Sequence, residues 1–330
     1  MVVKFSKPIL IGSAIGSIVG CSIIIKDYCA GNKYEEPNLI ENKVVIVTGA
    51  NTGIGKETVR ELAKRKGKII MACRNLQLCE KAREEIVLET NNKYVYCRKC
   101  DLSSQESIKK FVETFKKEEN RLHILINNAG VMRCPPLKTK EGIEMQFGVN
   151  HIGHFLLTMM LLDVLKKSAP SRIINVSSIA HFRGRINKED LNSERNYDGG
   201  TAYAQSKLAN ILFTNELARK LEGTGVTVNS VHPGIVETEI TRHMSFFNST
   251  ISSLFLKPII RIFLKNPIQG AQTTLYAALS PDLEGVTGKY FSNCMETKTS
   301  QEARDESLAR WLWAVSMKWT KLDNAKEYHI

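Results

Sequence analysis

The chain has 330 residues, of which 43% are hydrophobic and 24% are charged, so it contains enough apolar residues to bury a large core. This composition excludes a largely disordered chain, a collagen-like repeat and a small disulfide-framed protein. The formal net charge is +12, but basic residues are interleaved with acidic ones along the chain and form no arginine stripe. We therefore expect no nucleic-acid partner.

The first predicted element is an apolar segment near the amino terminus. Residues 8–25 carry no charge, and a helix of this length reaches about 27 Å, enough to cross the core of a bilayer. A cleaved signal peptide is the alternative, but no small-residue cleavage site precedes Lys26. We predict a transmembrane or signal-anchor helix within a membrane anchor over 1–27, a polar linker over 28–42 and one folded domain over 43–330.

The folded domain alternates short β-branched runs with amphipathic stretches. We predict strands near 43–47, 68–73, 94–97, 123–126, 172–176, 226–231 and 288–291. We predict helices near 56–66, 76–90, 105–118, 142–167, 202–222 and 268–280. Because each pair of parallel strands needs a crossover, this pattern predicts a single Rossmann-type α/β domain with a doubly wound parallel sheet of about seven strands.

Two longer segments, 180–200 and 239–266, interrupt this alternation where insertions around a binding crevice are expected. Within the second, residues 246–264 combine many Phe, Ile and Leu residues with a few basic ones. Two interpretations stay open for this stretch. It is either an ordinary core helix or an apolar lid with a basic edge that contacts membrane lipid.

A glycine-rich segment, Thr48–Gly55, follows the first predicted strand and opens the first helix. Gly49, Gly53 and Gly55 allow a tight turn and a close approach of the backbone to a pyrophosphate at the helix N-terminus. A plain strand-to-helix turn is the alternative. At the end of the second strand, where an acidic residue would bind the ribose of NAD, the chain has Arg74, whose guanidinium favours the 2′-phosphate of NADP.

Tyr203 and Lys207 lie four residues apart, so they share one face of the helix predicted over 202–222. A nearby cation favours the phenolate, and we therefore expect Lys207 to lower the pKa of Tyr203 toward the range useful for proton transfer. This spacing alone is also typical of an exposed helix pair. Its combination with the glycine segment favours a catalytic pair.

These motifs together resemble those of the short-chain dehydrogenases/reductases. Thr48–Gly55 is similar to the family's glycine motif, Asn127–Gly130 to its NNAG sequence and Tyr203–Lys207 to its YxxxK sequence. The agreement runs from about residue 43 to 291. More narrowly, Arg74 within ACRN, together with the NNAGVMRCP and SKLAN sequences, resembles the microsomal and mitochondrial retinol dehydrogenases.

The resemblance implies a set of catalytic and cofactor-binding residues. The implied catalytic residues are Asn150, Ser178, Tyr203 and Lys207. The implied NADP(H)-binding residues are Gly49, Asn51, Thr52, Gly53, Ile54, Gly55, Arg74, Asp101, Leu102, Asn128, Gly130, Tyr203, Lys207, Pro233, Gly234 and Thr238. Tyr203 would exchange a proton with the substrate oxygen and Ser178 would hydrogen-bond that oxygen, while Lys207 would hold the ribose and Asn150 a relay water. Ser177 competes with Ser178 for its position, and the family spacing favours Ser178.

The function that the resemblance implies is NADP(H)-dependent interconversion of an apolar alcohol and its carbonyl, with retinol and retinal as the first candidates. Steroids and fatty aldehydes stay open as substrates, and so does a nonenzymatic, nucleotide-sensing membrane scaffold. The expected partners are the apolar substrate and membrane lipid, through the N-terminal segment and through 246–264, and a homodimer stays open. The resemblance implies a mitochondrial membrane, with the endoplasmic reticulum as the alternative.

Three further groups of residues are expected to have structural roles. Eight cysteines in 330 residues are too sparse for a disulfide framework, so we expect reduced thiols. His151 and His154 lie three residues apart, but nothing nearby completes a metal site, so no metal is expected. Trp311, Trp313 and Trp319 are expected to pack a helix or to contact a membrane interface.

Overall fold

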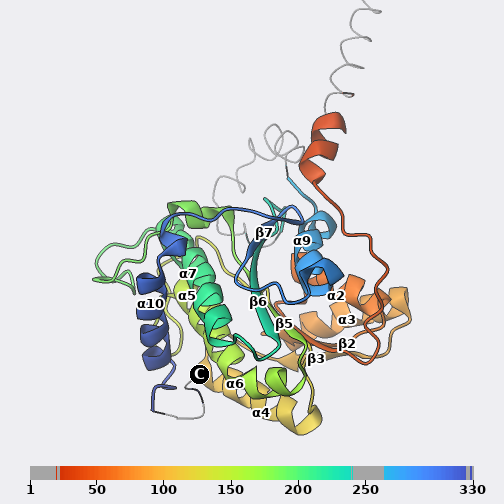
Figure 1. The fold of residues 1–330 in the computed structure, drawn as a ribbon, viewed down its shortest axis with the longest axis horizontal. Helices are drawn as coiled ribbons and strands as arrows, with labels where there is room; N and C mark the ends of the chain where they lie inside the picture. The colour runs from red at the N-terminus through yellow and green to blue at the C-terminus, as the bar shows by residue number, and fades with distance from the viewer. Residues whose placement is uncertain (1–19, 21–22, 239, 241–263, 325–327, 329–330) are drawn as a thin grey trace, which may run out of the picture.

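The computed structural model describes residues 20, 23–238, 240, 264–324 and 328. An eight-stranded sheet lies between two layers of helices (Figure 1). The strands are β1 (Val44–Thr48), β2 (Lys68–Cys73), β3 (Val95–Lys99), β4 (Ile124–Asn127), β5 (Ser171–Val176), β6 (Val226–His232), β7 (Tyr290–Ser292) and β8 (Met295–Glu296). Their order is β3-β2-β1-β4-β5-β6-β7-β8, and the chain reverses direction across the sheet between β1 and β4. Ligands bind at such a switch point in open α/β sheets.

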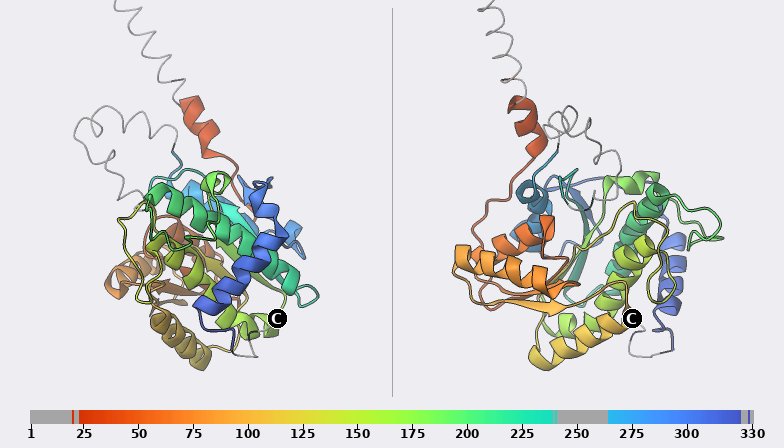
Figure 2. Two further views of the ribbon diagram at one scale, coloured as in Figure 1. Left: turned by 90° about the vertical axis from the view of Figure 1, so that its left-hand side faces the viewer. Right: turned by 180° about the vertical axis from the view of Figure 1, so that it is seen from behind.

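The helices fall into two layers, one on each face of the sheet (Figures 1 and 2). The first layer holds α2 (Gly53–Lys64), α3 (Leu76–Thr90) and α9 (Pro267–Leu279). The second layer holds α4 (Gln105–Glu118), α6 (Gly153–Lys167) and α7 (Gly199–Lys220), with α10 (Glu306–Trp319) packed on α7. Side chains of β1 alternate between the two cores, since Ile46 faces the second layer and Val45 faces the first.

Most predicted elements are confirmed, and the bounds of α3 and α4 coincide with the predicted ranges. The sheet differs from the prediction at one edge. Seven strands are parallel as expected, but β8 adds an eighth, antiparallel strand through Phe291 and Ser292 of β7. β8 has two residues, which is too short for a recognisable hydrophobic pattern. Helix α10 was also not among the predicted elements.

The helix predicted near 142–167 is confirmed over Met145–Lys167, but it contains a π-helical turn that was not predicted. The structure has a short helix α5 (Met145–Phe147), a π-helical turn η1 (Gly148–Ile152) and then α6. Among the described residues, Met145–Lys167 is the one helical stretch long and apolar enough to cross a membrane, yet 89% of its apolar window is buried inside the protein. It is therefore a core helix of the domain, and the π-turn within it carries Asn150.

Most of the predicted anchor, and all of 246–264 except its last residue, lie outside the described residues. Residues 23–30 are helical, so the helix continues past the predicted start of the linker at 28, and the chain is irregular from 31 to 40 (Figure 2). The backbone N–H of Asn32 donates to Oδ1 of Asn293 at 2.7 Å. This bond fixes the chain leaving helix 23–30 beside the segment that follows β7.

One expectation about the cysteines is wrong. Cys79 on α3 and Cys97 on β3 form a disulfide, with their Cα atoms 6.0 Å apart. Both side chains are buried between the helix and the sheet. The two residues are 18 positions apart, and only the packing of α3 over β3 brings them together, so cysteine spacing could not reveal the pair.

Helix α10 confirms the packing role expected for the tryptophans. The Trp313 ring lies 5.1 Å from that of Phe155, and the Trp319 ring lies 5.8 Å from that of Phe147, measured between centroids. His151 is also bonded to this helix, because its Nε2 lies 2.9 Å from Oγ of Ser316. Helix α10 thereby packs against η1 and α6.

Candidate active site at the carboxyl edge of the sheet

The glycine loop between β1 and α2 is closed tightly against its neighbours. A Cβ atom at Gly55 would lie 2.4 Å from the carbonyl oxygen of Gly49 and 2.5 Å from Nδ2 of Asn128. Gly49 has a φ of +64°, which only glycine adopts readily. Thr52 precedes α2 without capping it through its side chain, so the first N–H groups of this helix are left for a ligand.

A cavity of about 610 Å³ opens beside this loop at the switch point of the sheet. Its lining contains twelve of the sixteen residues expected to bind the cofactor: Gly49, Asn51, Thr52, Gly53, Ile54, Gly55, Arg74, Asp101, Leu102, Asn128, Gly130 and Thr238. Tyr203, Lys207, Pro233 and Gly234 are not part of this lining. A cavity lined by bare glycines, by the first turn of a helix and by a cation, Arg74, fits a dinucleotide.

The hydroxyl of Thr48, at the end of β1, fixes the loop that follows β4. Its Oγ1 accepts hydrogen bonds from the backbone N–H groups of Asn128 and Ala129, both at 2.9 Å. In return, Nδ2 of Asn128 donates to the carbonyl oxygen of Thr48 at 2.8 Å. The two loops that line the cavity are therefore bonded directly to each other.

Asn150 is held by both ends of its side-chain amide. Its Oδ1 accepts from the N–H of Val131 at 2.9 Å, and its Nδ2 donates to the carbonyl oxygen of Val131 at 3.0 Å and to Oγ of Ser206 at 2.9 Å. Its carbonyl oxygen is contacted by Nδ1 of His154 at 3.0 Å. Both residues of this contact lie at the π-turn, which spans Gly148–Ile152 and leads into α6.

His154 joins Asn150 to Thr48, a connection that sequence reasoning missed. Its Nε2 lies 2.9 Å from Oγ1 of Thr48, while its Nδ1 lies against the carbonyl of Asn150. Burial lowers the pKa of His154 to about 4, so the ring is neutral and one nitrogen donates while the other accepts. The structural role expected for His154 fits these contacts. No spacing in the sequence signals its partner, which is 106 residues away.

The predicted catalytic residues come together at one end of this site. Ser178 follows β5 and lies beside Tyr203 on α7, where its hydroxyl acts to lower the pKa of the phenol. One turn further along α7, Nζ of Lys207 lies 5.7 Å from the centre of the Tyr203 ring and donates to the carbonyl oxygen of Val176 at 2.9 Å. A Cβ atom at Gly130 would lie 3.7 Å from this Nζ, so Lys207 faces the end of the cavity.

The hydrogen bonding of Ser177 decides which of the two adjacent serines lies beside Tyr203. Ser177 donates through Oγ to the carbonyl oxygen of Lys207 at 2.7 Å, so its hydroxyl is bonded to backbone and Ser178 remains the serine beside the phenol.

Gly234 has a φ of +90°, and a Cβ atom there would meet the side chain of Lys265 at 2.8 Å. A side chain at position 234 would therefore strain the turn after β6.

The expected direction of the Tyr203 pKa is wrong for the protein alone. Burial raises the pKa of Tyr203 to about 12, and the hydrogen bond from Ser178 opposes this shift only in part. Burial also lowers the pKa of Lys207 to about 8. Desolvation penalises the charged form of each group, and it outweighs the attraction that their spacing on the helix predicts.

Comparison with known proteins identifies the family. A model of the short chain dehydrogenase family matches residues 43–246. The chain is 51% identical over 319 residues to retinol dehydrogenase 13 of Homo sapiens, covering 96% of each chain. It is 53% identical over 277 residues to retinol dehydrogenase 11 of Homo sapiens, covering 84% of this chain and 85% of that protein. The chain belongs to the short-chain dehydrogenase family.

Family membership confirms that the protein is an enzyme, an alcohol dehydrogenase of the short-chain type. Among solved structures, an uncharacterised protein from Mycobacterium paratuberculosis is similar with a TM-score of 0.71 and 33% identity, covering 88% of this chain and 98% of that chain. The Rossmann-type fold predicted from the alternation of strands and helices is thereby confirmed.

The pKa of Lys207 predicts a pH dependence of dinucleotide binding. Below about pH 8 the amine is charged and attracts the anionic ligand, and above this value it becomes neutral, so affinity should fall as the pH rises through about 8. Titrating the protein with the reduced dinucleotide and following its fluorescence between pH 6.5 and 9.5 measures this fall. Lys207→Arg, which stays charged, should lack it. An equal fall in Lys207→Met would assign the dependence to another group.

Proposed function

We propose that this short-chain dehydrogenase uses NADP(H) to interconvert an apolar alcohol and its carbonyl, with retinol and retinal as the first substrates to test. The observation that carries the proposal is the meeting of Ser178, Tyr203 and Lys207 at the end of the dinucleotide cavity. The names of the relatives that are about half identical to this chain supply the retinoid part of the proposal.

The chemistry of the site divides between the cofactor and the chain. When bound, the nicotinamide supplies or accepts the hydride. Tyr203 donates a proton from Oη to the substrate oxygen during reduction, and the raised pKa keeps this proton on the phenol until it is needed. Ser178 donates a hydrogen bond to the same oxygen. In the direction of oxidation, the charged form of Lys207 favours the phenolate that accepts the proton.

Exposed apolar side chains around these residues support an apolar substrate. Ile179 and Phe182 lie in the 3-10 helix that follows Ser178, and Ile235 follows Gly234, yet the three side chains are 54%, 47% and 64% exposed. Three large apolar residues at the same edge of the sheet offer a surface for a hydrocarbon. Steroids and fatty aldehydes share this property with retinoids, so they remain alternative substrates.

We also propose that residues 1–27 anchor the enzyme in a membrane. The hydrogen bond between Asn32 and Asn293 places the chain that leaves helix 23–30 beside the carboxyl end of β7. Since β7 is parallel to β6, this end lies at the same edge of the sheet as the catalytic residues. A lipophilic substrate would then reach the site from the bilayer. A mitochondrial membrane is the first location to test, and the endoplasmic reticulum is the alternative.

The catalytic proposal predicts that Tyr203→Phe reduces turnover of all-trans-retinal by a hundredfold or more, because the phenol supplies the proton. Binding of NADPH should stay nearly unchanged. Tyr94→Phe, which removes an exposed hydroxyl, is the matched control and should keep full activity. Equal activity of Tyr203→Phe and wild type would end the proposal, whereas no turnover of retinal, a steroid ketone or nonanal by wild type with NADPH bound would favour the nonenzymatic scaffold.

The cofactor proposal predicts that Arg74→Asp weakens binding of NADPH by at least about tenfold and leaves binding of NADH nearly unchanged. Only NADPH carries the 2′-phosphate that the guanidinium would bind. Arg83→Asp is the control, because Arg83 lies on α3, the helix that follows Arg74, but is paired with Glu80 and does not line the cavity. An unchanged ratio of the two affinities would remove Arg74 from cofactor selection.

The membrane proposal predicts that deletion of residues 1–27 moves the expressed protein from the membrane pellet to the supernatant after carbonate extraction. The full-length chain should stay in the pellet, because an apolar helix of this length is stable in the bilayer. If the shortened chain also resists extraction, another segment, such as 246–264, must hold it there.

A further inference from the structure

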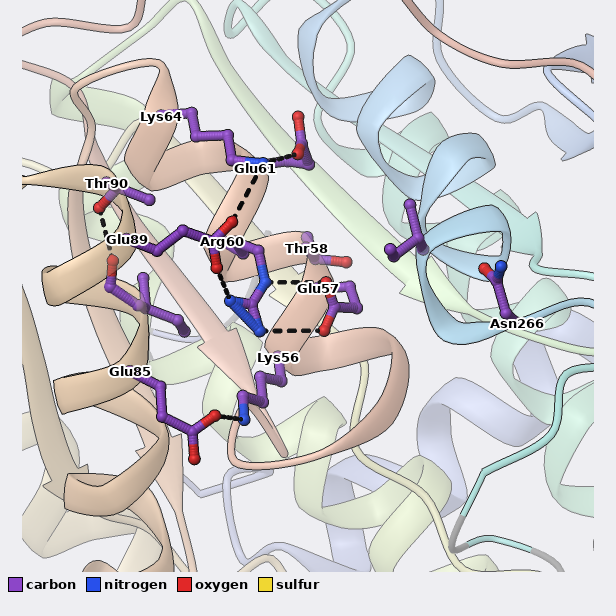
Figure 3. A network of polar contacts seen from close by, with 12 residues as sticks. Lys56, Glu57, Thr58, Arg60, Glu61, Lys64, Glu85, Glu89, Thr90 and Asn266 are labelled. Atoms are coloured by element: carbon purple, nitrogen blue, oxygen red, sulfur yellow. Dashed lines mark hydrogen bonds and ion pairs between the residues drawn. The ribbon is translucent and has the colours of Figure 1, made fainter.

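A ladder of ion pairs joins α2 and α3 (Figure 3). Lys56 on α2 pairs with Glu85 on α3 at 2.5 Å. Further along the two helices, Arg60 pairs with both Glu57 and Glu89, and Figure 3 shows this second rung lying beside the first. The ladder neutralises the basic side chains of α2 and ties that helix to α3.

Two basic side chains in this region do not belong to the ladder of ion pairs. Among the residues that the structure describes, no carboxylate oxygen lies within 4.0 Å of the side-chain nitrogens of Arg74 or Lys81. Both line the dinucleotide cavity. By contrast, Arg83, two positions after Lys81 and outside the lining, is paired with Glu80. The unpaired cations of this region are therefore the ones that face the cavity.

The helical periodicity of α3 places Lys81 on the face of the helix that lines the cavity. The lining residues of α3 and its cap are Asn75, Leu78, Lys81, Ala82 and Glu85, which recur every three or four positions and so form one face of the helix. Arg74 directly precedes the cap at the end of β2. The same face thus joins the arginine expected to bind the 2′-phosphate to a second basic side chain.

Both acidic residues in the cavity lining are occupied by other partners. The carboxylate of Glu85 is bonded to Lys56, and the pKa of Glu85 is lowered, chiefly by this hydrogen bond and charge, with smaller contributions from Lys81 and Arg60. Oδ1 of Asp101 accepts from the N–H and the hydroxyl of Ser103 at 3.0 and 2.7 Å. This end of the cavity therefore presents two unpaired cations against one neutralised carboxylate.

We propose that Lys81 is a second cation that binds the 2′-phosphate of NADP(H) and that Lys56 neutralises Glu85, which would otherwise repel this phosphate. A phosphate monoester carries nearly two charges, so an arginine that binds it through two N–H groups leaves charge for a second cation. The proposal rests on the NADP(H) preference proposed above. It adds the ion pair of Lys56 and Glu85, which sets the electrostatic field at the phosphate without contacting the phosphate.

The test uses the full-length protein in detergent and four probes: NADPH, NADH, 2′,5′-ADP and 5′-AMP. Lys81→Met should weaken binding of NADPH and 2′,5′-ADP by about fivefold and leave NADH and 5′-AMP unchanged, because only the first two carry the 2′-phosphate. Lys64→Met is the matched control. Lys64 belongs to the same ladder, paired with Glu61 and Glu89, but does not line the cavity.

A double variant tests the role of Lys56. Lys56→Met exposes the charge of Glu85 and should weaken NADPH and 2′,5′-ADP by about fivefold, whereas adding Glu85→Gln should restore the loss. A helix that had merely been loosened would not be restored by removal of the second partner. Failure of this rescue, or equal losses for NADPH and NADH, would overturn the proposal.

The outcomes distinguish failure of this proposal from failure of the NADP(H) preference on which it rests. If the wild-type protein binds NADPH and NADH equally, the cofactor preference itself fails. If the wild type prefers NADPH and Arg74→Asp removes the preference, while Lys81→Met leaves it intact, then only the role of Lys81 fails. A fall in the salt dependence of 2′,5′-ADP binding in Lys81→Met would support the proposal further, since charge pairing is screened by salt.

Discussion

The hydroxyl of Thr48 is the contact on which the rest of the site depends. It lies buried at the end of β1 and bonds the loop after β4 on one side and the ring of His154 on the other. His154 in turn contacts the carbonyl of Asn150, at the π-turn before α6. One small side chain thus links the glycine loop, the loop after β4 and the helical turn that carries Asn150, a predicted catalytic residue.

Burial governs the electrostatics of the catalytic end. Tyr203 and Lys207 are both shifted toward their neutral forms, because each loses the hydration of its charged form inside the protein. At the other end of the cavity, Arg74 and Lys81 have no carboxylate partner among the described residues, and Glu85 and Asp101 are bonded to other groups. A phosphate-bearing ligand would therefore meet a positive field there.

The strongly patterned elements of this chain could be read from its sequence. The ranges of α3 and α4 follow from a helical period, and β2 from a β-branched run, because each pattern is local. The contacts of Asn150 at the π-turn could not be predicted in this way, since they join it to Val131 on another loop. The disulfide between α3 and β3 likewise required a contact made only by tertiary packing.

The sequence by itself determined the family and the order of strands and helices, and it predicted the catalytic residues, because these rest on local motifs such as Tyr203 and Lys207 at one helical turn. Only the tertiary structure decided the ionisation of those two groups and the partners of His154 and Lys56. Desolvation and pairing depend on which distant segments enclose a side chain, and that information does not lie in the spacing of neighbouring residues.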